Sequence, residues 1–519
     1  MIGLRQGLLD RRMAAVLLDD DRHPTQWLAR RAENPMDVST QATRETRHSA
    51  MLAPEAPRSP PLAPASDPPR AEGASARAAL LSGPVLPTLF RLALPTMTVL
   101  VAQTAVNVAE AYYVGFLGTD ALAGVALVFP IFMLMTMMSN GGIGSGVSSA
   151  VARAVGGGRT GDADAIAFHA IVLAVVAGGL FTLATTLLGP ALYHALGGRA
   201  GALDAALSYS NYLFAGAIPV WIVNLQAAAL RGAGNVRVPA LVTLVGALVM
   251  IPASPLLIFG LGPLPGLGIA GAGIAFGLYY CGAMLVLVRY MASGRSSLHV
   301  RVARLQVRLF ADILKVGLPT ALNAVLVNLT VILVTALAGR FGTSELAAYG
   351  IASRLDYIMI PILFGLCTAT LTMVGINVGA GHGARARRIA WISALTGAAL
   401  VGTIGLIVAL YPPLWLGLFS HDADVLHEGT IYLRTVAPAY TALGFGFVLS
   451  FAGQGAGHVL WPFVGSTLRV LIAAGGGYLA IVWFGGGMAS LAAMVTLSLV
   501  VYALVCCRVL SGRIWRASA

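Results

Sequence analysis

Residues 92–159 read LALPTMTVLVAQTAVNVAEAYYVGFLGTDALAGVALVFPIFMLMTMMSNGGIGSGVSSAVARAVGGGR. Two apolar runs, each long enough to cross a bilayer as a helix, flank the turn Gly115–Thr119. One carboxylate, Glu110, lies within the first run. A charged side chain at membrane depth is costly unless it faces protein or water, so Glu110 is a candidate functional residue.

The same frame recurs in the second half of the chain. Five landmarks repeat at an offset of 224 or 223 positions (319 − 95 and 379 − 156, for example): Pro95 and Pro319, Gly118 and Gly342, Ala123 and Ala347, Gly156 and Gly379, and Gly232 and Gly455. An offset this constant indicates that the chain arose by duplication. The position equivalent to Glu110 is Val334 (334 − 110), so the repeat itself does not require an acid there.

The composition of this 519-residue chain is typical of a membrane protein. Hydrophobic residues make up 57% and charged residues 10%, and the mean hydropathy is +0.81. A soluble domain carries about 25% charged residues, so we predict an all-α polytopic protein in contact with the lipid bilayer. The formal charge of +12 is explained by basic cytoplasmic loops, and we expect no nucleic-acid partner. The four cysteines show no metal-ligand spacing, so we expect no metal site.

The apolar runs predict twelve transmembrane helices arranged as two parallel repeats of six. They cover about 92–114, 121–151, 165–188, 207–230, 238–260 and 269–291 in the first half, and about 316–338, 346–375, 389–411, 430–452, 460–484 and 487–508 in the second. Pro130 is expected to kink the second helix, because proline removes a helical hydrogen bond.

The remaining segments complete the predicted domain organisation. Residues 1–78 are rich in proline, alanine and charged residues without sustained periodicity, which predicts a disordered cytoplasmic tail. The two bundles then cover 79–295 and 316–519. Residues 296–315 form a cytoplasmic linker, in which alternating apolar and basic residues predict a helix lying along the membrane interface.

The loop cations predict the orientation. The basic residues gather in the loops on one side of the membrane. The loops on the other side offer little beyond Arg199 and Arg340. We therefore expect both termini in the cytoplasm of a cell whose inner membrane holds the protein as a monomer. Six helices per half give both halves the same orientation, a plan that transporters use with the substrate site between the halves. The basic set comprises Arg153, Arg159, Arg231, Arg237, Arg289, Arg295, Arg301, Arg304, Arg308, Lys315, Arg385, Arg387 and Arg388.

Several motifs, in their order along the chain, resemble those of the multidrug and toxic compound extrusion (MATE) family. They are LALP at 92–95, the acid at 110 before YVG, GTxALA at 118–123, ALRGAG at 229–234, PLLIFG at 255–260, GLP at 317–319 and VGxNxGAG at 374–381. The resemblance covers residues 85–510. It implies a twelve-helix, cation-driven antiporter that exports organic, above all cationic, drugs or metabolites. Such a protein is no enzyme and needs no cofactor besides its coupling ion.

The departures from the family pattern bear on the coupling ion. Family members usually carry Asp where this chain has Glu110, and an acid where it has Ser254. Many family members also carry an acid in the seventh helix, at the position that is Val327 or Asn328 in this chain. Because hard cations prefer several oxygen ligands, the scarcity of carboxylates favours H⁺ coupling over Na⁺, with Na⁺ as the alternative.

The candidate site residues are the polar and aromatic side chains at membrane depth. Glu110 and Asn107 are the candidates for cation coupling, although Glu110 near a helix end also fits a side chain that reaches the interface. Some of the amides are expected to join helices instead, and Asp356 beside Arg354 also fits a structural ion pair. The candidates for the substrate cavity are Tyr112, Asn224, Gln226, Ser254, Tyr279, Asn323, Asn328, Arg354, Asp356 and Tyr357.

Two other functions were weighed against export. A lipid-linked saccharide flippase of the same wider superfamily would line its cavity with several cations, for which Arg354, Arg434 and Arg469 are available. A membrane enzyme would need paired acids, a metal cluster or a nucleophile at membrane depth. The acids and histidines at 421–428 do cluster, but in a short external loop, so we expect no enzyme. The basic motif of major-facilitator transporters between the second and third helices is absent.

Overall fold

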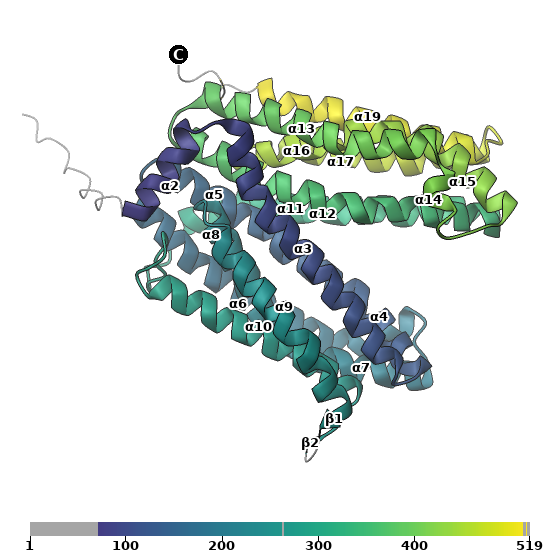
Figure 1. Ribbon diagram of the computed structural model, residues 1–519, viewed down its shortest axis with the longest axis horizontal. Coiled ribbons are helices and arrows are strands. Elements are labelled where there is room, and N and C mark those ends of the chain that lie inside the picture. Colours follow the sequence, from purple (N-terminus) through teal and green to yellow (C-terminus); the bar gives the residue numbers. More distant parts are fainter. Residues whose placement is uncertain (1–70, 262–263, 512–514, 516–519) are drawn as a thin grey trace, which may run out of the picture. The chain divides into compact units, whose positions relative to one another are not determined.

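The computed structural model describes residues 71–261, 264–511 and 515, except for the side chains of 71–76, 261, 264, 357 and 358. The described residues belong to one compact unit, drawn as a ribbon in Figure 1. The disordered tail predicted for 1–78 lies outside the described residues up to residue 70. For residues 71–78, the last eight positions of the predicted tail, the prediction of disorder is wrong, because the helix α2 covers Ala71–Ser82.

The first half of the described chain is built from helices and one very short hairpin, in which Gly260 pairs with Pro265 and Leu261 with Leu264. After α2 the elements are α3 (Val85–Gly115), α4 (Thr119–Thr136), the π-helix η1 (Met137–Ile143), α5 (Gly144–Gly156), α6 (Thr160–Ala195), α7 (Ala200–Ala215), α8 (Ala217–Gly232), α9 (Arg237–Phe259), β1 (Gly260–Leu261), β2 (Leu264–Pro265) and α10 (Ile269–Ala292).

In the second half, all the regular elements among the described residues are helices. Its elements are α11 (Val307–Ala338), α12 (Thr343–Gly379), α13 (Gly383–Leu410), α14 (Pro413–Leu416), α15 (Ala423–Val436), the 3₁₀ helix η2 (Ala437–Ala439), α16 (Tyr440–Ala456), α17 (Leu460–Val470), the π-helix η3 (Leu471–Gly476), α18 (Gly477–Val482), α19 (Met488–Cys507) and the 3₁₀ helix η4 (Arg508–Ser511).

The membrane spans agree with the predicted fold class. Among the described residues, eleven helices are long and apolar enough to cross a membrane, and twelve if α7 and α8 count as one span bent by 49°. In the second half, the span equivalent to α7 and α8 is formed by α15 and α16, and the 3₁₀ helix η2 interrupts it at the equivalent position. Each half therefore contributes six spans, as the repeat predicts.

Two local predictions have different outcomes. The kink at Pro130 stays a prediction: α4 is helical through this residue, and the π-helix η1 begins about two turns later, at Met137. The predicted interfacial helix before the seventh span is not separate, because α11 runs without a break from Val307 into the membrane. Its apolar positions, Leu309 and Ile313, are fully buried in protein, so the alternating pattern marks a helix packed on a core rather than on lipid.

Each half has its own hydrophobic core, and the halves exchange the starts of two helices. Leu89 and Leu92 of α3 belong to the core of the second half. In return, Leu309 and Ile313 of α11 belong to the core of the first. Figure 1 shows α3 crossing between the two halves, and it packs on both α12 and α9. The exchange ties the halves together at the ends where α3 and α11 begin.

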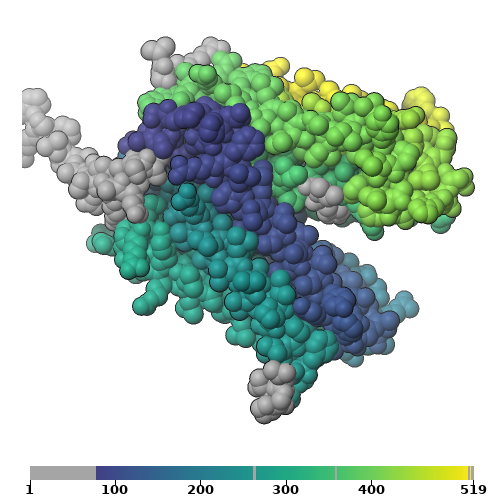
Figure 2. Space-filling view, viewed as in Figure 1, coloured from purple at the N-terminus to yellow at the C-terminus, as the bar shows by residue number. Residues whose placement is uncertain are grey.

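Two glycines related by the repeat let the halves touch backbone to backbone. A Cβ added at Gly156 would lie 2.0 Å from the carbonyl oxygen of Ile376, and one at Gly379 would lie 2.2 Å from that of Arg153. The two contacts are equivalent by the repeat, since Ile376 corresponds to Arg153 and Gly379 to Gly156 at an offset of 223 positions (376 − 153 and 379 − 156). This contact joins the ends of α5 and α12, whereas Figure 2 shows the surface hollowed between α3 and α4 on one side and the second half on the other.

Candidate functional site

Glu110 is enclosed by the first half rather than directed to the membrane surface. Only 6% of its surface is exposed. The hydroxyl of Tyr209, from α7, donates a hydrogen bond of 3.2 Å to its Oε1. Tyr280 of α10 lies close enough to interact with the carboxylate charge. This burial argues against a side chain that reaches the interface.

One face of α3 carries the polar residues that lead to Glu110. Thr96, Gln103, Asn107 and Glu110 follow each other at helical spacings of seven, four and three residues, which places them on one side of the helix. Thr96 and Gln103 line a cavity in the first half. At 1.5 Å per residue, Glu110 lies about 10 Å beyond Gln103 along the helix axis.

The cavity is enclosed mainly by helices of the first half. It has about 540 Å³ of empty space, including the part open to solvent, and its lining comes from α3, η1, α8, α9 and α10. Phe364 of α12 closes it from the second half.

The π-helix η1 directs two consecutive polar side chains toward α8. Ser139 Oγ accepts a hydrogen bond of 2.8 Å from Asn224 Nδ2. Asn140 Oδ1 accepts one of 2.7 Å from Arg231 Nη2. π-helical turns are frequent at functional sites, and here the wider turn supplies the partners of two cavity-lining groups, Asn224 and Arg231.

Two tyrosines of α10 form an aromatic wall. Tyr279 and Tyr280 both line the cavity, with ring centroids 4.7 Å apart in an edge contact. Gly246 of α9 leaves room for the ring of Tyr279, since a Cβ at that position would lie 2.1 Å from its Cε2. Thr243 of α9 lies near the Tyr279 hydroxyl.

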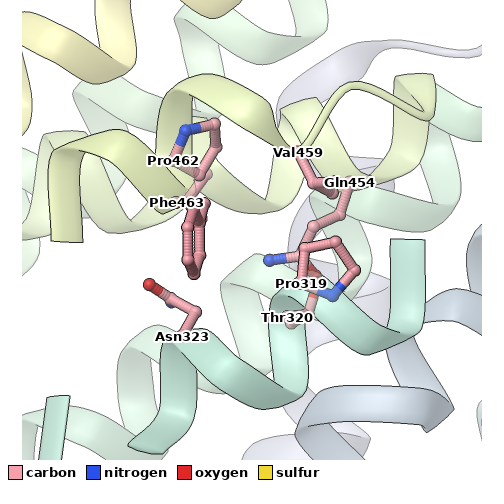
Figure 3. A pocket seen from close by; sticks show the side chains of 8 residues that line it. Pro319, Thr320, Asn323, Gln454, Val459, Pro462 and Phe463 are labelled. Carbon is pink, nitrogen blue, oxygen red and sulfur yellow. The ribbon is translucent and has the colours of Figure 1, made fainter. Parts of the chain in front are cut away.

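The second half has a much smaller hollow, of about 180 Å³, between α11, α16 and α17. Figure 3 shows Asn323 and the ring of Phe463 facing each other across it, with Gln454 and Thr320 at the other end. The side-chain oxygens of Asn323 and Gln454 are buried without a hydrogen-bond partner among the described residues. The hollow suits a water molecule better than an organic substrate.

Four other sequence candidates do not line either of these cavities. Tyr112 is 65% exposed and makes an edge contact with Phe116. Gln226 faces α6, where its Nε2 donates to the Ala167 carbonyl. Ser254 is buried in α9. Asn328 is exposed and contacts Met137 Sδ of η1 at 3.4 Å. For Gln226 this follows from helical geometry, because it comes two positions after the lining residue Asn224 and points in a different direction.

The expected ion pair of Arg354 and Asp356 does not form. Arg354 is exposed, with its guanidinium 5.4 Å from the ring centroid of Phe419. The Asp356 carboxyl interacts with the Tyr440 hydroxyl, and its Oδ1 has no hydrogen-bond partner among the described residues. Residues two apart on a helix diverge by about 200°. The side chain of Tyr357 lies outside the described ones.

One residue among the acids and histidines at 421–428, Asp422, has a structural role. Asp422 caps the N-terminus of α15, accepting hydrogen bonds from the backbone N–H of Asp424 and Val425. Among the described residues, no group of three or more His, Cys, Asp or Glu side chains is arranged to hold a metal ion.

Sequence reasoning missed four residues of the site. Tyr209, Gln103 and Asn140 carried no motif, although Gln103 shares the helix face of Glu110. Arg231 was counted with the cytoplasmic loops, but it belongs to the last turn of α8 and lines the cavity. Its depth depends on how the two halves close, which no local pattern encodes.

Comparisons with known proteins agree with this architecture. The chain is 25% identical to the FAD transporter of Shewanella oneidensis over 72% of its own length and 83% of the relative's. It is also 25% identical to the probable multidrug resistance protein YoeA of Bacillus subtilis, over 68% and 78% respectively. The first of these relatives is named as a transporter and the second as a multidrug resistance protein.

Solved structures show the same fold. A MOP superfamily transporter from Pyrococcus furiosus, for which a binding pocket of reverse polarity is described, superposes with a TM-score of 0.76 at 25% identity over 84% of this chain and 97% of that one. A MATE transporter in a bent conformation gives a TM-score of 0.78 at 24% identity, with the same coverage. The MatE family model matches residues 95–256 and again residues 319–479, once for each half. The chain therefore belongs to the MatE family of membrane transporters.

Proposed function

We propose that this protein exports organic compounds in exchange for protons, by alternating access between its two halves. The observation that carries the proposal is the enclosed Glu110 carboxyl on the polar face of α3, since it joins a titratable group to the same helix that lines the cavity. The names of the relatives, multidrug resistance and FAD transport, support export of organic molecules.

A proton suits Glu110 better than a metal ion does. Its hydrogen-bond donor is the neutral Tyr209 hydroxyl, and among the described residues it belongs to no group of three or more His, Cys, Asp or Glu side chains that could hold a metal ion. Hard cations prefer several oxygen ligands in one shell. A carboxyl group surrounded by apolar atoms can instead take up and release a proton, because burial favours the neutral form and an open conformation favours the charged one.

The coupling uses two conformations that bind the proton unequally. With Glu110 charged, the Tyr209 hydroxyl donates to it and fixes α3 against α7. With Glu110 neutral, that hydrogen bond weakens and α3 is free to repack, which changes the cavity that Thr96 and Gln103 line. A ligand shifts a conformational equilibrium only by its difference in affinity for the two states, and protonation of Glu110 provides such a difference.

The conformation described here is proposed to be the outward-facing one. The halves touch where α5 and α12 end, beside Arg153 and Arg385, the side that the loop cations assign to the cytoplasm. Both termini are then cytoplasmic, in an inner membrane. Opening to the cytoplasm requires that the contact between Gly156 and Ile376 separate.

The flippase alternative receives no support from the cavities. Arg354, Arg434 and Arg469, the cations on which it depended, line neither of the two described. The lining of the first-half cavity contains Arg231 and no carboxylate, so the predicted preference for organic cations has no counter-charge there.

Efflux from proteoliposomes under an imposed pH gradient tests the coupling, with ethidium and riboflavin 5′-phosphate as trial substrates. Glu110→Gln should reduce gradient-driven efflux to the level of protein-free vesicles while the protein folds normally, and Glu110→Asp should retain part of it. Glu428→Gln, at a half-buried glutamate of α15, is the matched control. Full activity of Glu110→Gln without Na⁺ would reject the coupling role. Efflux that responds only to a Na⁺ gradient would replace H⁺ by Na⁺.

A further inference from the structure

Arg231 is a positive charge inside the protein without a negative partner. It lies in the last turn of α8 and is enclosed by surrounding helices, yet part of its surface remains accessible from the cavity. Its side chain donates one hydrogen bond, from Nη2 to the neutral Asn140 Oδ1. The ion pairs among the described residues, Asp162 with Arg159 and with Arg308, do not include it.

An enclosed guanidinium without a counter-charge is unusual in a folded protein. Removing a charge from water is expensive, and proteins recover the cost by pairing it with an opposite charge or by binding one. A guanidinium has five N–H donors in a planar fork, which matches a carboxylate or a phosphate. With one donor used by Asn140, the others are available to a ligand that enters the cavity.

The rest of the lining suits a flat aromatic ring. Tyr279 and Phe364 offer aromatic surfaces, one from each half of the protein, and Gln103 and Asn224 offer amides at the cavity wall. Glu110 lies about 10 Å beyond Gln103 along α3 and is not among the lining residues. The carboxylate is therefore at a distance from the site where Arg231 would hold an anion.

We propose that the first-half cavity binds an organic anion, a flat aromatic ring that bears a carboxylate or phosphate, with Arg231 as the anchor of the anionic group and Tyr279 and Phe364 against the ring. The proposal deepens the proposed export function by naming its substrate class and rests on that function for its physiological meaning. It replaces the organic cations that the family resemblance implied, because the charge of the lining is positive.

Equilibrium binding to the purified protein, without any ion gradient, tests the charge preference. Riboflavin 5′-phosphate and riboflavin share one ring and differ by the phosphate, and ethidium is a flat cation. The phosphate should bind at least tenfold more tightly than riboflavin, and ethidium more weakly than either. Arg231→Gln should remove the difference between phosphate and riboflavin, and Arg231→Lys should keep part of it. Arg237→Gln, at an exposed arginine six positions later, should change nothing.

Asn140→Asp is a second variant that keeps the arginine in place. The new carboxylate would stand where Asn140 Oδ1 now accepts from Arg231, and it would neutralise the guanidinium from within the protein. We expect a folded protein of equal or higher melting temperature that has lost its preference for the phosphate. Because this variant adds a partner rather than removing one, loss of binding cannot be ascribed to misfolding.

The outcomes separate this inference from the proposed function. Tighter binding of ethidium than of riboflavin 5′-phosphate, or unchanged phosphate binding in both Arg231→Gln and Asn140→Asp, overturns the anion site whatever drives transport. Arg231-dependent phosphate binding in a protein whose efflux ignores the pH gradient supports the site and rejects the proton coupling. An effect of Glu110→Gln on efflux but not on equilibrium binding of the phosphate supports both.

Discussion

The two halves of this protein share a backbone plan but differ in chemistry. Three side chains of the first half have apolar or uncharged equivalents in the second at the offset of 223 or 224 positions. Glu110 corresponds to Val334, Asn224 to Phe447 and Arg231 to Gln454 (334 − 110, 447 − 224 and 454 − 231). The cavity of the second half is also smaller, with about 180 Å³ of empty space against about 540 Å³ for the cavity of the first half.

The elements that both halves keep are those that bring them together. Gly156 and Gly379 make reciprocal contacts, and the starts of α3 and α11 are exchanged between the two cores. Alternating access needs two similar bodies that rock against each other, and duplication supplies them. Binding and coupling need only one copy of a charged group. Under the proposed function, this difference assigns closure to both halves and the ligand chemistry to the first half.

The largest expected effect is all or none and concerns the orientation of the two halves. In a cysteine-free background, Asp120→Cys and Thr343→Cys should react with an impermeant maleimide on intact cells. Arg159→Cys and His382→Cys should react only after permeabilisation. All four positions are exposed, and each pair is related by the repeat (343 − 120 and 382 − 159). An opposite pattern in one half would show an inverted repeat instead of a parallel one.

The contact between the ends of α5 and α12, made at Gly156 and Gly379, is called the closure contact here. A substitution that disrupts it should reduce transport to a similar extent from either half. Gly156→Ala and Gly379→Ala each place a methyl group against a carbonyl oxygen, at 2.0 Å and 2.2 Å before relaxation. The backbones must separate, and such overpacking typically costs about 1–3 kcal/mol. We expect both variants to lose most of their transport, measured as efflux per correctly inserted protein, and by similar amounts.

Gly161→Ala and Gly350→Ala are the matched controls for the closure contact, since an added Cβ would meet no atom within 4 Å at either position. Both should transport normally. Normal transport by Gly156→Ala together with loss in Gly379→Ala would show that the reciprocal contact is not shared equally by the halves.

The helix α2 has no equivalent in the second half. The corresponding stretch before α11, residues 296–306, is not helical. Arg77 Nη2 donates to the carbonyl of Gly156, the last residue of α5. Asn377 of α12 donates to the Leu80 carbonyl, and Arg385 of α13 donates to that of Gly83. α2 therefore contacts both halves where they close, and Leu80 is buried there, with 4% of its surface exposed.

Deletion of residues 1–70 should leave the melting temperature and transport unchanged, whereas deletion of 1–82 should lower both. Leu80→Ala isolates the packing contribution, with an expected loss of about 2–4 kcal/mol of unfolding free energy. Leu86→Ala, at a 44% exposed leucine of α3, is the control and should lose less than about 0.5 kcal/mol. Thermal unfolding in detergent with a fluorescent reporter measures each. An unaltered melting temperature after deletion of 1–82 would contradict a role for α2 in closure.

Much of the architecture could be predicted from the sequence because its signals are local. Apolar runs give the twelve spans, and the repeated offset gives the two halves. Glu110 stands out for the same reason, as a charge within an apolar run. The role of α2 was not predictable, since its contacts with Asn377 and Arg385 come from positions some 300 residues away. Arg231 looked like a loop cation because its enclosure depends on η1, which supplies Asn140.

The smallest expected effect concerns two tyrosines at equivalent positions, Tyr209 and Tyr432 (432 − 209 = 223). Both are buried beside a carboxyl group, but only Tyr209 hydrogen-bonds the group assigned to coupling, Glu110. The Tyr432 ring makes an edge contact with Tyr349 at 5.4 Å, while the nearby Asp356 interacts with the Tyr440 hydroxyl. The same substitution therefore tests one hydroxyl that serves the proposed coupling and one that does not.

Tyr209→Phe keeps the ring and removes the donor to Glu110. A hydrogen bond to a charged group contributes about 1.5 kcal/mol at the lower end of its range, or about tenfold in an equilibrium, and the 3.2 Å length points to that lower end. We expect proton-driven efflux to fall about tenfold or less, with exchange at equal pH on both sides nearly unchanged, because the cavity is intact. Tyr432→Phe should change proton-driven efflux less than twofold. Equal losses in the two variants would assign both hydroxyls to packing and would remove Tyr209 from the coupling step, since a purely structural role does not distinguish driven efflux from exchange.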